Sequence, residues 1–235
     1  MSLPGFSDVV HNAPYLLQGL RFSLCLTAAT FCIGLLLGTA MALSMHLKVP
    51  VIGVAVRVYV AVIRSVPLIM VLFWLFFLMP TLLRWLTSSA RPMPLGATTT
   101  AYITFALFEA AYYCEIIRVG LRSVPKGQNE AAEALSLSGI NTYLFVILPQ
   151  VFKAVTPIVL TQTIILFQDT SLVYVLSLND LLGAADKLAQ ISGKLTEYYS
   201  AVAIIYLVIC AGASQLVRHV QKRTLSDLRI RKVKA

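Results

Sequence analysis

Five long apolar segments constrain this 235-residue chain more than any other feature of its sequence. Each is at or near the roughly 20 residues that an α-helix needs to cross about 30 Å of hydrocarbon. We expect membrane spans at about 20–45, 58–79, 98–119, 154–178 and 198–217. The second contains Pro67, and Gln168, Asp169 and Thr170 interrupt the fourth. The segments predict an all-α integral membrane protein with about five transmembrane helices.

The composition supports a membrane class and excludes two others. Hydrophobic residues make up 58% of the chain and charged residues 12%, with a mean hydropathy of +0.82. Soluble domains average about 45–50% apolar and about 25% charged residues. The chain therefore has too little charge for a soluble enzyme and too many apolar residues for a disordered protein. Because it shows no linker, low-complexity stretch or internal repeat, we expect one transmembrane domain over 1–235.

Much of the net positive charge of +9 lies near the C-terminus. The last segment, 218–235, holds seven of the 19 Lys and Arg residues: Arg218, Lys222, Arg223, Arg229, Arg231, Lys232 and Lys234. A basic run directly after an apolar segment is typical of a cytoplasmic flank. A bare tail lacks a nucleic-acid recognition fold. We therefore predict a basic cytoplasmic tail and no nucleic-acid partner.

The loops give the orientation of the spans. Lys48 and Arg57 flank the first loop, and Arg118, Arg122 and Lys126 open the third. Positive residues concentrate on the cytoplasmic side of membrane proteins. These two loops and the tail are therefore expected in the cytoplasm. An odd number of spans then places the N-terminus outside and the C-terminus inside.

The third loop, about 123–153, is richer in helix formers than a linker. Residues 130–135 read Glu-Ala-Ala-Glu-Ala-Leu, with Pro125 and Gly127 before them and Ser138 and Gly139 after them. This pattern predicts a short cytoplasmic helix whose small Ala side chains suit a partner's groove. The alternative is an amphipathic connector that rests on lipid headgroups.

Charged residues inside the spans are functional candidates, because burial in the bilayer costs at least about 2.5–3.5 kcal/mol each. Glu115 and Arg118 lie three residues apart and favour an ion pair on one helix face. Arg64 either lies on a translocation pathway or lies near the cytoplasmic end of its helix and extends to the membrane–water interface. Glu109 either pairs with another helix or lines a wet cavity. Asp169 is the strongest candidate. It lies in a run of four polar residues, 168–171, which cannot all face lipid.

Several catalytic and metal-binding motifs are absent from the sequence. No G-x-x-x-x-G-K-[ST] phosphate loop, H-E-x-x-H pair or G-x-S-x-G elbow occurs. The four cysteines have no metal-ligand spacing. We therefore expect no enzyme, no catalytic residue, no metal and no cofactor in this chain.

Several stretches of the sequence together carry a resemblance. They read RSVPLIMVLFW at 64–74, FEAAYYCEIIR at 108–118, PKGQ at 125–128, EAA at 130–132, VILPQ at 146–150 and LFQDTSLVYVLSL at 166–178. In this order they resemble the polar amino-acid permeases of ABC importers, from about Leu16 to about Arg223. Three of them look most like permeases for glutamate and aspartate.

The resemblance implies a type I ABC importer permease fold in a bacterial inner membrane. It implies a second permease (a similar chain or a second copy), two ATPase subunits that bind ATP and Mg, and an extracytoplasmic amino-acid-binding protein. It assigns coupling to the ATPase to Glu130, Ala131, Ala132, Leu135 and Ser136. The translocation path would be formed by Arg64, Glu109, Gln168, Asp169, Thr170 and Ser171.

One position departs from the family pattern. Where the family has glycine, this chain has Ser136, and serine disfavours a positive φ. We therefore expect Gly139 to make the turn after the coupling helix.

Charge alone leaves the substrate open. Arg64 suits an acidic amino acid, whereas Glu109 and Asp169 would repel it, so only the resemblance favours glutamate or aspartate over glutamine, histidine or basic amino acids. An ion-coupled secondary carrier and a scaffold subunit remain as alternatives.

Overall fold

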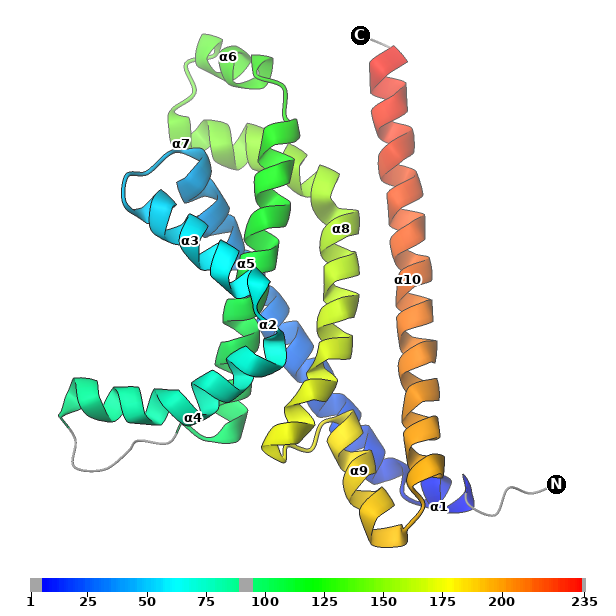
Figure 1. Ribbon diagram of the computed structural model, residues 1–235. Coiled ribbons are helices and arrows are strands. Elements are labelled where there is room, and N and C mark those ends of the chain that lie inside the picture. Colours follow the sequence, from blue (N-terminus) through cyan, green and yellow to red (C-terminus); the bar gives the residue numbers. More distant parts are fainter. Residues whose placement is uncertain (1–5, 89–94, 234–235) are drawn as a thin grey trace.

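The computed structural model describes the backbone of residues 6–88 and 95–233 and the side chains of 7–88 and 95–222. Within these ranges the chain is all-helical (Figure 1). The side chains of the predicted tail beyond Lys222, and all of Lys234, lie outside the described residues. The elements are α1 (Phe6–His11), α2 (Ala13–His46), α3 (Ile52–Ser65), α4 (Leu68–Thr87), α5 (Ala97–Ser123), α6 (Gly127–Ala134), α7 (Gly139–Asn141), η1 (Thr142–Ile147), α8 (Leu148–Asp169), η2 (Thr170–Leu176), α9 (Leu181–Ser192) and α10 (Leu195–Val233).

Four helical stretches of the described chain are long and apolar enough to cross a membrane: Ala13–His46, Leu68–Thr87, Gly139–Leu176 and Leu195–Lys222. They overlap the first, second, fourth and fifth predicted spans. The predicted third span lies in α5, which has 27 residues but is less apolar than these four. The reason is its central position, since α5 packs against α2, α3, α4 and α8. A helix enclosed by protein carries polar groups that a lipid-facing helix cannot.

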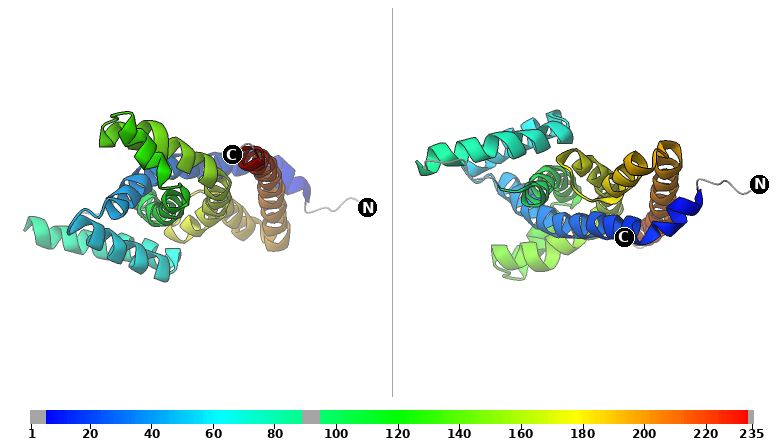
Figure 2. Two further views of the ribbon diagram at one scale, coloured as in Figure 1. Left: turned by 90° about the horizontal axis from the view of Figure 1, so that it is seen from above. Right: turned by 90° about the horizontal axis from the view of Figure 1, so that it is seen from below.

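The second predicted span, 58–79, is divided into two helices at Pro67. Val66 is extended, with φ −115° and ψ 137°, because the ring of the following proline disfavours a helical conformation there. In both views of Figure 2, α5 is seen nearly end-on while α4 extends sideways from the bundle. The break therefore redirects the chain and does not merely bend one helix.

The most extensive helix contact described joins α2 to α5. A Cβ atom at Gly38 would lie 2.8 Å from the carbonyl oxygen of Ala110 and 2.8 Å from the amide nitrogen of Cys114. Only glycine allows the two backbones to approach this closely, as at small-residue contacts between membrane helices. This contact fixes the position of α5, which contributes Tyr112 and Glu115 to the site described below.

Different elements lie at the two ends of the bundle. The α2–α3 turn, α6, α7 and the C-terminal end of α10 lie at the top of Figure 1, and α1 and α9 lie at the bottom. The cationic first and third loops thus share one end, as the sequence predicts. The short helix expected in the third loop is confirmed as α6.

The turn after α6 is made by Ser136, with φ 56°, so the expectation that Gly139 makes it is wrong. Ser136 N–H donates to the carbonyl of Glu133 at 2.8 Å and Leu137 N–H to that of Ala132 at 3.1 Å, which caps the end of the helix. Gly139 instead begins α7, capped by Ser138. A small, exposed serine occupies the left-handed region here at modest cost.

Val51 has a strained backbone, and its replacement should stabilise the protein. Its φ of 65° and ψ of −58°, with Ile52 N–H donating to Pro50 O at 2.7 Å, form a classic γ-turn. Val51 is 81% exposed. We expect Val51→Gly to raise the free energy of unfolding by about 1 kcal/mol, since the strain exceeds the entropy cost of glycine.

The measurement is the thermal unfolding midpoint of the detergent-purified protein. Ile52→Gly is the matched control, because Ile52 is exposed and begins α3 without strain. A lower midpoint for Val51→Gly than for the wild type would contradict the assignment of strain.

Candidate functional site

Two helix breaks face one another across a cavity of about 420 Å³. One is the break at Pro67, and the other is the end of α8 at Asp169, where the chain continues as the 3₁₀ helix η2. The cavity is lined by Arg64, Ser65, Val66, Pro67, Leu68, Ile69, Phe108, Tyr112, Asp169 and Leu172. Broken helices at membrane depth are tolerated where they line a cavity.

Arg64, at the end of α3, provides the cation of this cavity. Its guanidinium carbon lies 5.4 Å from the centre of the Tyr112 ring, within range of a cation–π interaction. One of its nitrogens lies 4.0 Å from Oε2 of Glu115. Glu115 is itself held by Arg118, whose Nε donates to Oε2 at 2.8 Å. The predicted Glu115–Arg118 ion pair is thus confirmed, and it positions Arg64 as well.

The first turn of α4 adds a second positive element. Leu68 and Ile69 follow the N-cap Pro67 and line the cavity. The first N–H groups of a helix lack acceptors within that helix, and its N-terminus carries a partial positive charge. Arg64 and the start of α4 therefore favour an anion in the same cavity.

Asp169 provides the opposite charge. It is half-buried and is the one carboxylate among the described residues that line this cavity. A group with a negative and a positive end, such as an amino acid, is complementary to Asp169 on one side and Arg64 on the other. Of the six residues predicted for the path, the structure brings these two together.

The other polar residues of the α8 break point elsewhere. Gln168 is exposed and is not among the residues that line the cavity. Thr170 is fully buried and donates its hydroxyl to the carbonyl of Phe167 at 2.7 Å. Ser171 is partly buried and is not among the residues that line the cavity.

Glu109 also lies outside the cavity. Its side chain is 1% exposed, and Gln162 Nε2 on α8 donates to its two carboxyl oxygens at 3.2 and 3.3 Å. Of the two readings of Glu109 from the sequence, the structure shows the contact with another helix. Its carboxyl group is therefore not among the groups that line the cavity beside Arg64.

The predicted coupling residues occupy both faces of α6 and its C-terminus. Ala132 is 2% exposed and faces the protein, whereas Glu130, Ala131, Leu135 and Ser136 are exposed. Leu135 is 75% exposed.

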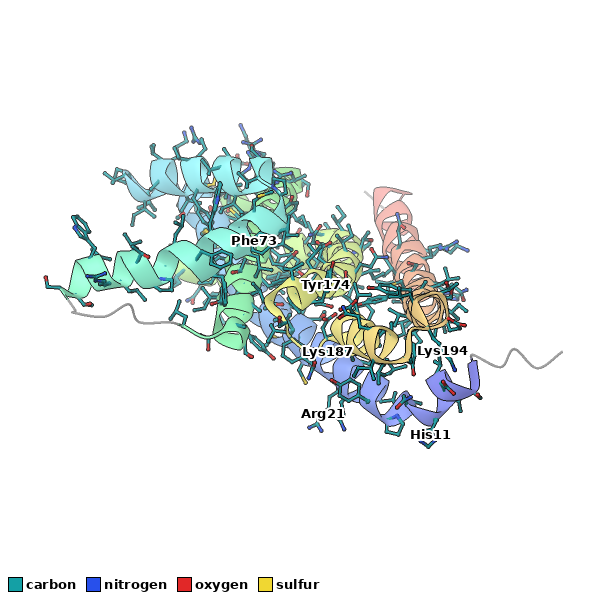
Figure 3. The ribbon with its side chains drawn as sticks, turned by 60° about the horizontal axis from the view of Figure 1, so that its bottom comes forward. His11, Arg21, Phe73, Tyr174, Lys187 and Lys194 are labelled. Carbon is teal, nitrogen blue, oxygen red and sulfur yellow. The ribbon has the colours of Figure 1, made fainter. Side chains whose placement is uncertain are left out.

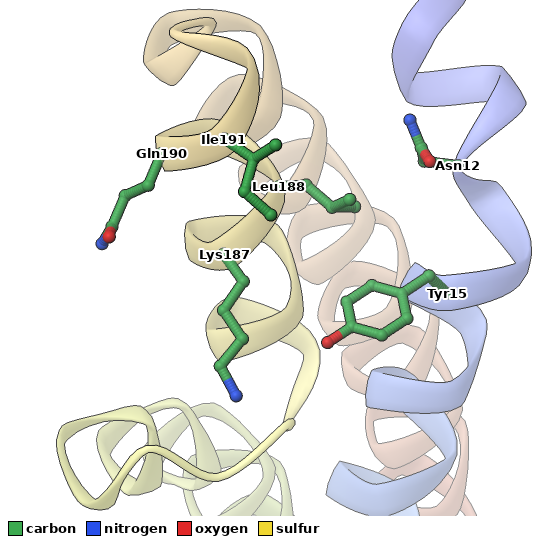
Figure 4. A pocket seen from close by; sticks show the side chains of 6 residues that line it. All are labelled: Asn12, Tyr15, Lys187, Leu188, Gln190 and Ile191. Atoms are coloured by element: carbon green, nitrogen blue, oxygen red, sulfur yellow. The ribbon is translucent and has the colours of Figure 1, made fainter.

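The opposite end of the molecule holds a larger cavity, of about 610 Å³ (Figure 4). It lies between the start of α2 and α9, and two of its polar side chains, Asn12 and Lys187, are engaged within the chain. Asn12 Nδ2 donates to the Tyr198 hydroxyl at 2.9 Å, and Lys187 Nζ donates to Asn179 Oδ1 at 2.5 Å. This end does not contain the residues that the sequence singled out for function.

Several basic side chains also lie at that end. His11, Arg21, Lys187 and Lys194 lie there (Figure 3). Lys194 forms an ion pair with Asp8, and its ammonium holds the pKa of the Asp8 carboxyl below its usual value.

The sequence did not indicate two contributors to the site, Tyr112 and the N-terminus of α4. Pro67 was the available signal for the second, because a proline within an apolar segment predicts a new helix start. The contact of Tyr112 with Arg64 had no signal, since it joins α3 and α5 through their tertiary packing.

Comparison with known proteins gives consistent matches over most of the chain. Residues 34–226 match the family described as binding-protein-dependent transport system inner membrane component. The glutamate/aspartate import permease protein GltK of Escherichia coli O6:H1 is 39% identical over 93% of this chain and 97% of its own length. The L-cystine transport system permease protein TcyB of Bacillus subtilis is 35% identical over 93% of this chain and 90% of its own.

A solved structure has a similar fold. The crystal structure of an amino acid ABC transporter with histidines matches with a TM-score of 0.80 and 29% sequence identity, over 93% of this chain and 98% of the solved one.

Proposed function

The chain belongs to the family of binding-protein-dependent transport system inner membrane components, and from this premise we propose that it carries glutamate and aspartate across the membrane. It is a membrane-spanning permease of the amino-acid ABC importer class. The proposal adds the substrate, the path and the coupling surface.

The charge arrangement of the cavity at the Pro67 break is the observation that carries the proposal. An acidic amino acid has two carboxylates and one ammonium group. Arg64 and the N-terminus of α4 suit the carboxylates, and Asp169 suits the ammonium group. Glu109, whose charge would oppose the substrate, is turned away and bonded to Gln162. The identity with GltK, whose name gives glutamate and aspartate, supports the same substrate class.

The exposed side of α6 is the proposed contact with an ATPase. In this proposal Ala131 and Leu135 enter a groove of that subunit, with Glu130 and Ser136 at the edges. Ala132 holds α6 against its own chain. The ATPase subunits bind ATP and Mg, and this chain takes no cofactor. Closure of the ATPase pair then alternates access to a path formed with a second permease.

The charge distribution supports an orientation with the α6 end in the cytoplasm. Lys48, Arg57 and Arg122 lie near this end, and among the described side chains no acidic group lies within ion-pair distance of them. At the opposite end Lys194 is paired with Asp8. The positive-inside bias therefore favours the α6 end as the cytoplasmic one, with the N-terminus outside and the binding protein docking near α1 and α9.

Purification of the full-length chain from its native membrane in a mild detergent tests this assembly. We expect an ATPase and a second permease, or a second copy of this chain, to co-purify and to be identified by mass spectrometry. The purified complex should take up labelled glutamate in proteoliposomes only with internal ATP. Uptake by the chain alone, driven by an ion gradient, would contradict the proposal and favour a secondary carrier.

A further inference from the structure

A third cavity, of about 480 Å³, lies at the α6 end and is strongly basic. Its lining residues come from the end of α2, the α2–α3 turn, α3 and the last turns of α5: Met45, His46, Lys48, Arg57, Arg118 and Arg122. Four of these six carry a permanent positive charge, and none is acidic. Neither the substrate path nor the coupling helix uses this cavity.

The cations of this cavity are poorly compensated within the chain. Arg118 is paired with Glu115, whose carboxylate also faces Arg64. Among the described residues, Lys48, Arg57 and Arg122 have no acidic group within ion-pair distance. Arg118 and Arg122 are four residues apart on one face of α5, where like charges repel. An anion from outside the chain would relieve this repulsion.

The conformation of Lys48 adds a second observation. Its φ is 52°, in the left-handed region that glycine occupies without strain at the end of a helix. Val49 N–H donates to Ser44 O at 3.0 Å across this turn. A lysine here therefore places a charge at the cavity at the expense of backbone strain.

The surface beside the cavity is apolar. On α3, Val54, Val58 and Val62 are 60%, 57% and 52% exposed, and their spacing of four residues puts them on one face. Leu47, next to Lys48, is 53% exposed. A cationic cavity that borders an apolar helix face fits a ligand with an anionic head and an apolar tail.

We propose that this cavity binds the phosphate headgroup of an anionic phospholipid, with an acyl chain along the valine face of α3. Arginine forms bidentate hydrogen bonds with phosphate oxygens, and basic pockets between helices on the cytoplasmic side suit such headgroups. The bound lipid joins the end of α2, α3 and α5, and α3 and α5 also contribute Arg64 and Tyr112 to the substrate cavity.

Native mass spectrometry of the purified full-length protein, with its co-purifying subunits, tests the proposal. We expect phosphatidylglycerol adducts to exceed phosphatidylcholine adducts by at least about tenfold. The variant Arg57→Gln/Arg122→Gln should lose this preference. Arg84→Gln should keep it, because Arg84 is exposed at the end of α4, outside the cavity. Equal adducts in the wild type and the double variant would overturn the proposal.

Two further measurements distinguish lipid binding from a loss of folding and from the binding of free phosphate. Lys48→Gly removes a cation and relieves the left-handed strain, so it should unfold at the same or a higher temperature and still bind less phosphatidylglycerol. Unchanged binding by this variant would count against the cavity. Phosphatidylglycerol in nanodiscs should raise the wild-type unfolding midpoint, and inorganic phosphate at equal concentration should not. If inorganic phosphate alone raised the unfolding midpoint as much as phosphatidylglycerol does, the ligand would be a free anion and the proposal would be overturned.

Discussion

Arg64→Gln should lower the efficiency of glutamate uptake, kcat/KM, on the order of 10²-fold, because charged hydrogen bonds contribute about 1.5–3 kcal/mol each. Arg64 is the one cation that lines the cavity at the Pro67 break, among the described residues. Its loss leaves the first turn of α4 as the remaining positive element beside Asp169. The measurement is ATP-dependent uptake by the reconstituted complex.

Arg64→Lys should recover part of the activity, since lysine keeps the charge but lacks the planar fork that stacks on Tyr112 and binds a carboxylate through two nitrogens. Arg84→Gln is the matched control, because it removes an exposed arginine outside the cavity, and it should transport like the wild type. Equal uptake by Arg64→Gln and Arg84→Gln would remove the cavity from the translocation path.

Leu135→Asp should uncouple the permease from its ATPase, with uptake reduced on the order of 30-fold. Leu135 is 75% exposed, so the substitution leaves no cavity within this chain and does not disturb its fold. Burying a carboxylate in an apolar groove of a partner loses at least about 2 kcal/mol, the threshold for a central interface residue. The measurements are uptake and the amount of ATPase that co-purifies.

Two matched comparisons support this test. Val51→Asp introduces the same charge at another exposed apolar position, in the turn before α3, and it should keep the ATPase bound. Ala131→Arg, on the exposed side of α6, should lose uptake while the protein inserts normally, whereas Ala132→Arg should reduce the amount of folded protein because Ala132 is buried. Normal uptake by Leu135→Asp and Ala131→Arg would show that α6 is only a connector.

The sequence predicted the fold well where a single local property decides the structure. Apolar length indicated α2, α8 and α10, and helix propensity indicated α6. The position of Pro67 marked a break, but the direction that α4 takes after it depends on packing with α5. The polar residues of α5 are explained by its central position, which the sequence alone does not reveal.

The candidate site was predictable in part. The cost of charge in a membrane singled out Arg64, Asp169 and Glu109, but it gave no direction for their side chains. Asp169 and Arg64 line one cavity, while Glu109 is buried against Gln162. That difference depends on the rotation of α5 and α8 relative to each other, which arises from long-range packing. The same limit applies to Ser136, whose backbone conformation is set by the end of α6.

The most direct test of the central claim is ATP-dependent uptake of labelled glutamate, glutamine and arginine, side by side, by the complete complex in proteoliposomes. The charge arrangement of Arg64, α4 and Asp169 predicts that glutamate uptake exceeds that of the other two by at least about tenfold, the effect of one charged hydrogen bond. Aspartate should compete with labelled glutamate. Preferred uptake of arginine or glutamine would contradict the account, because the cavity would then recognise its substrate without the second carboxylate.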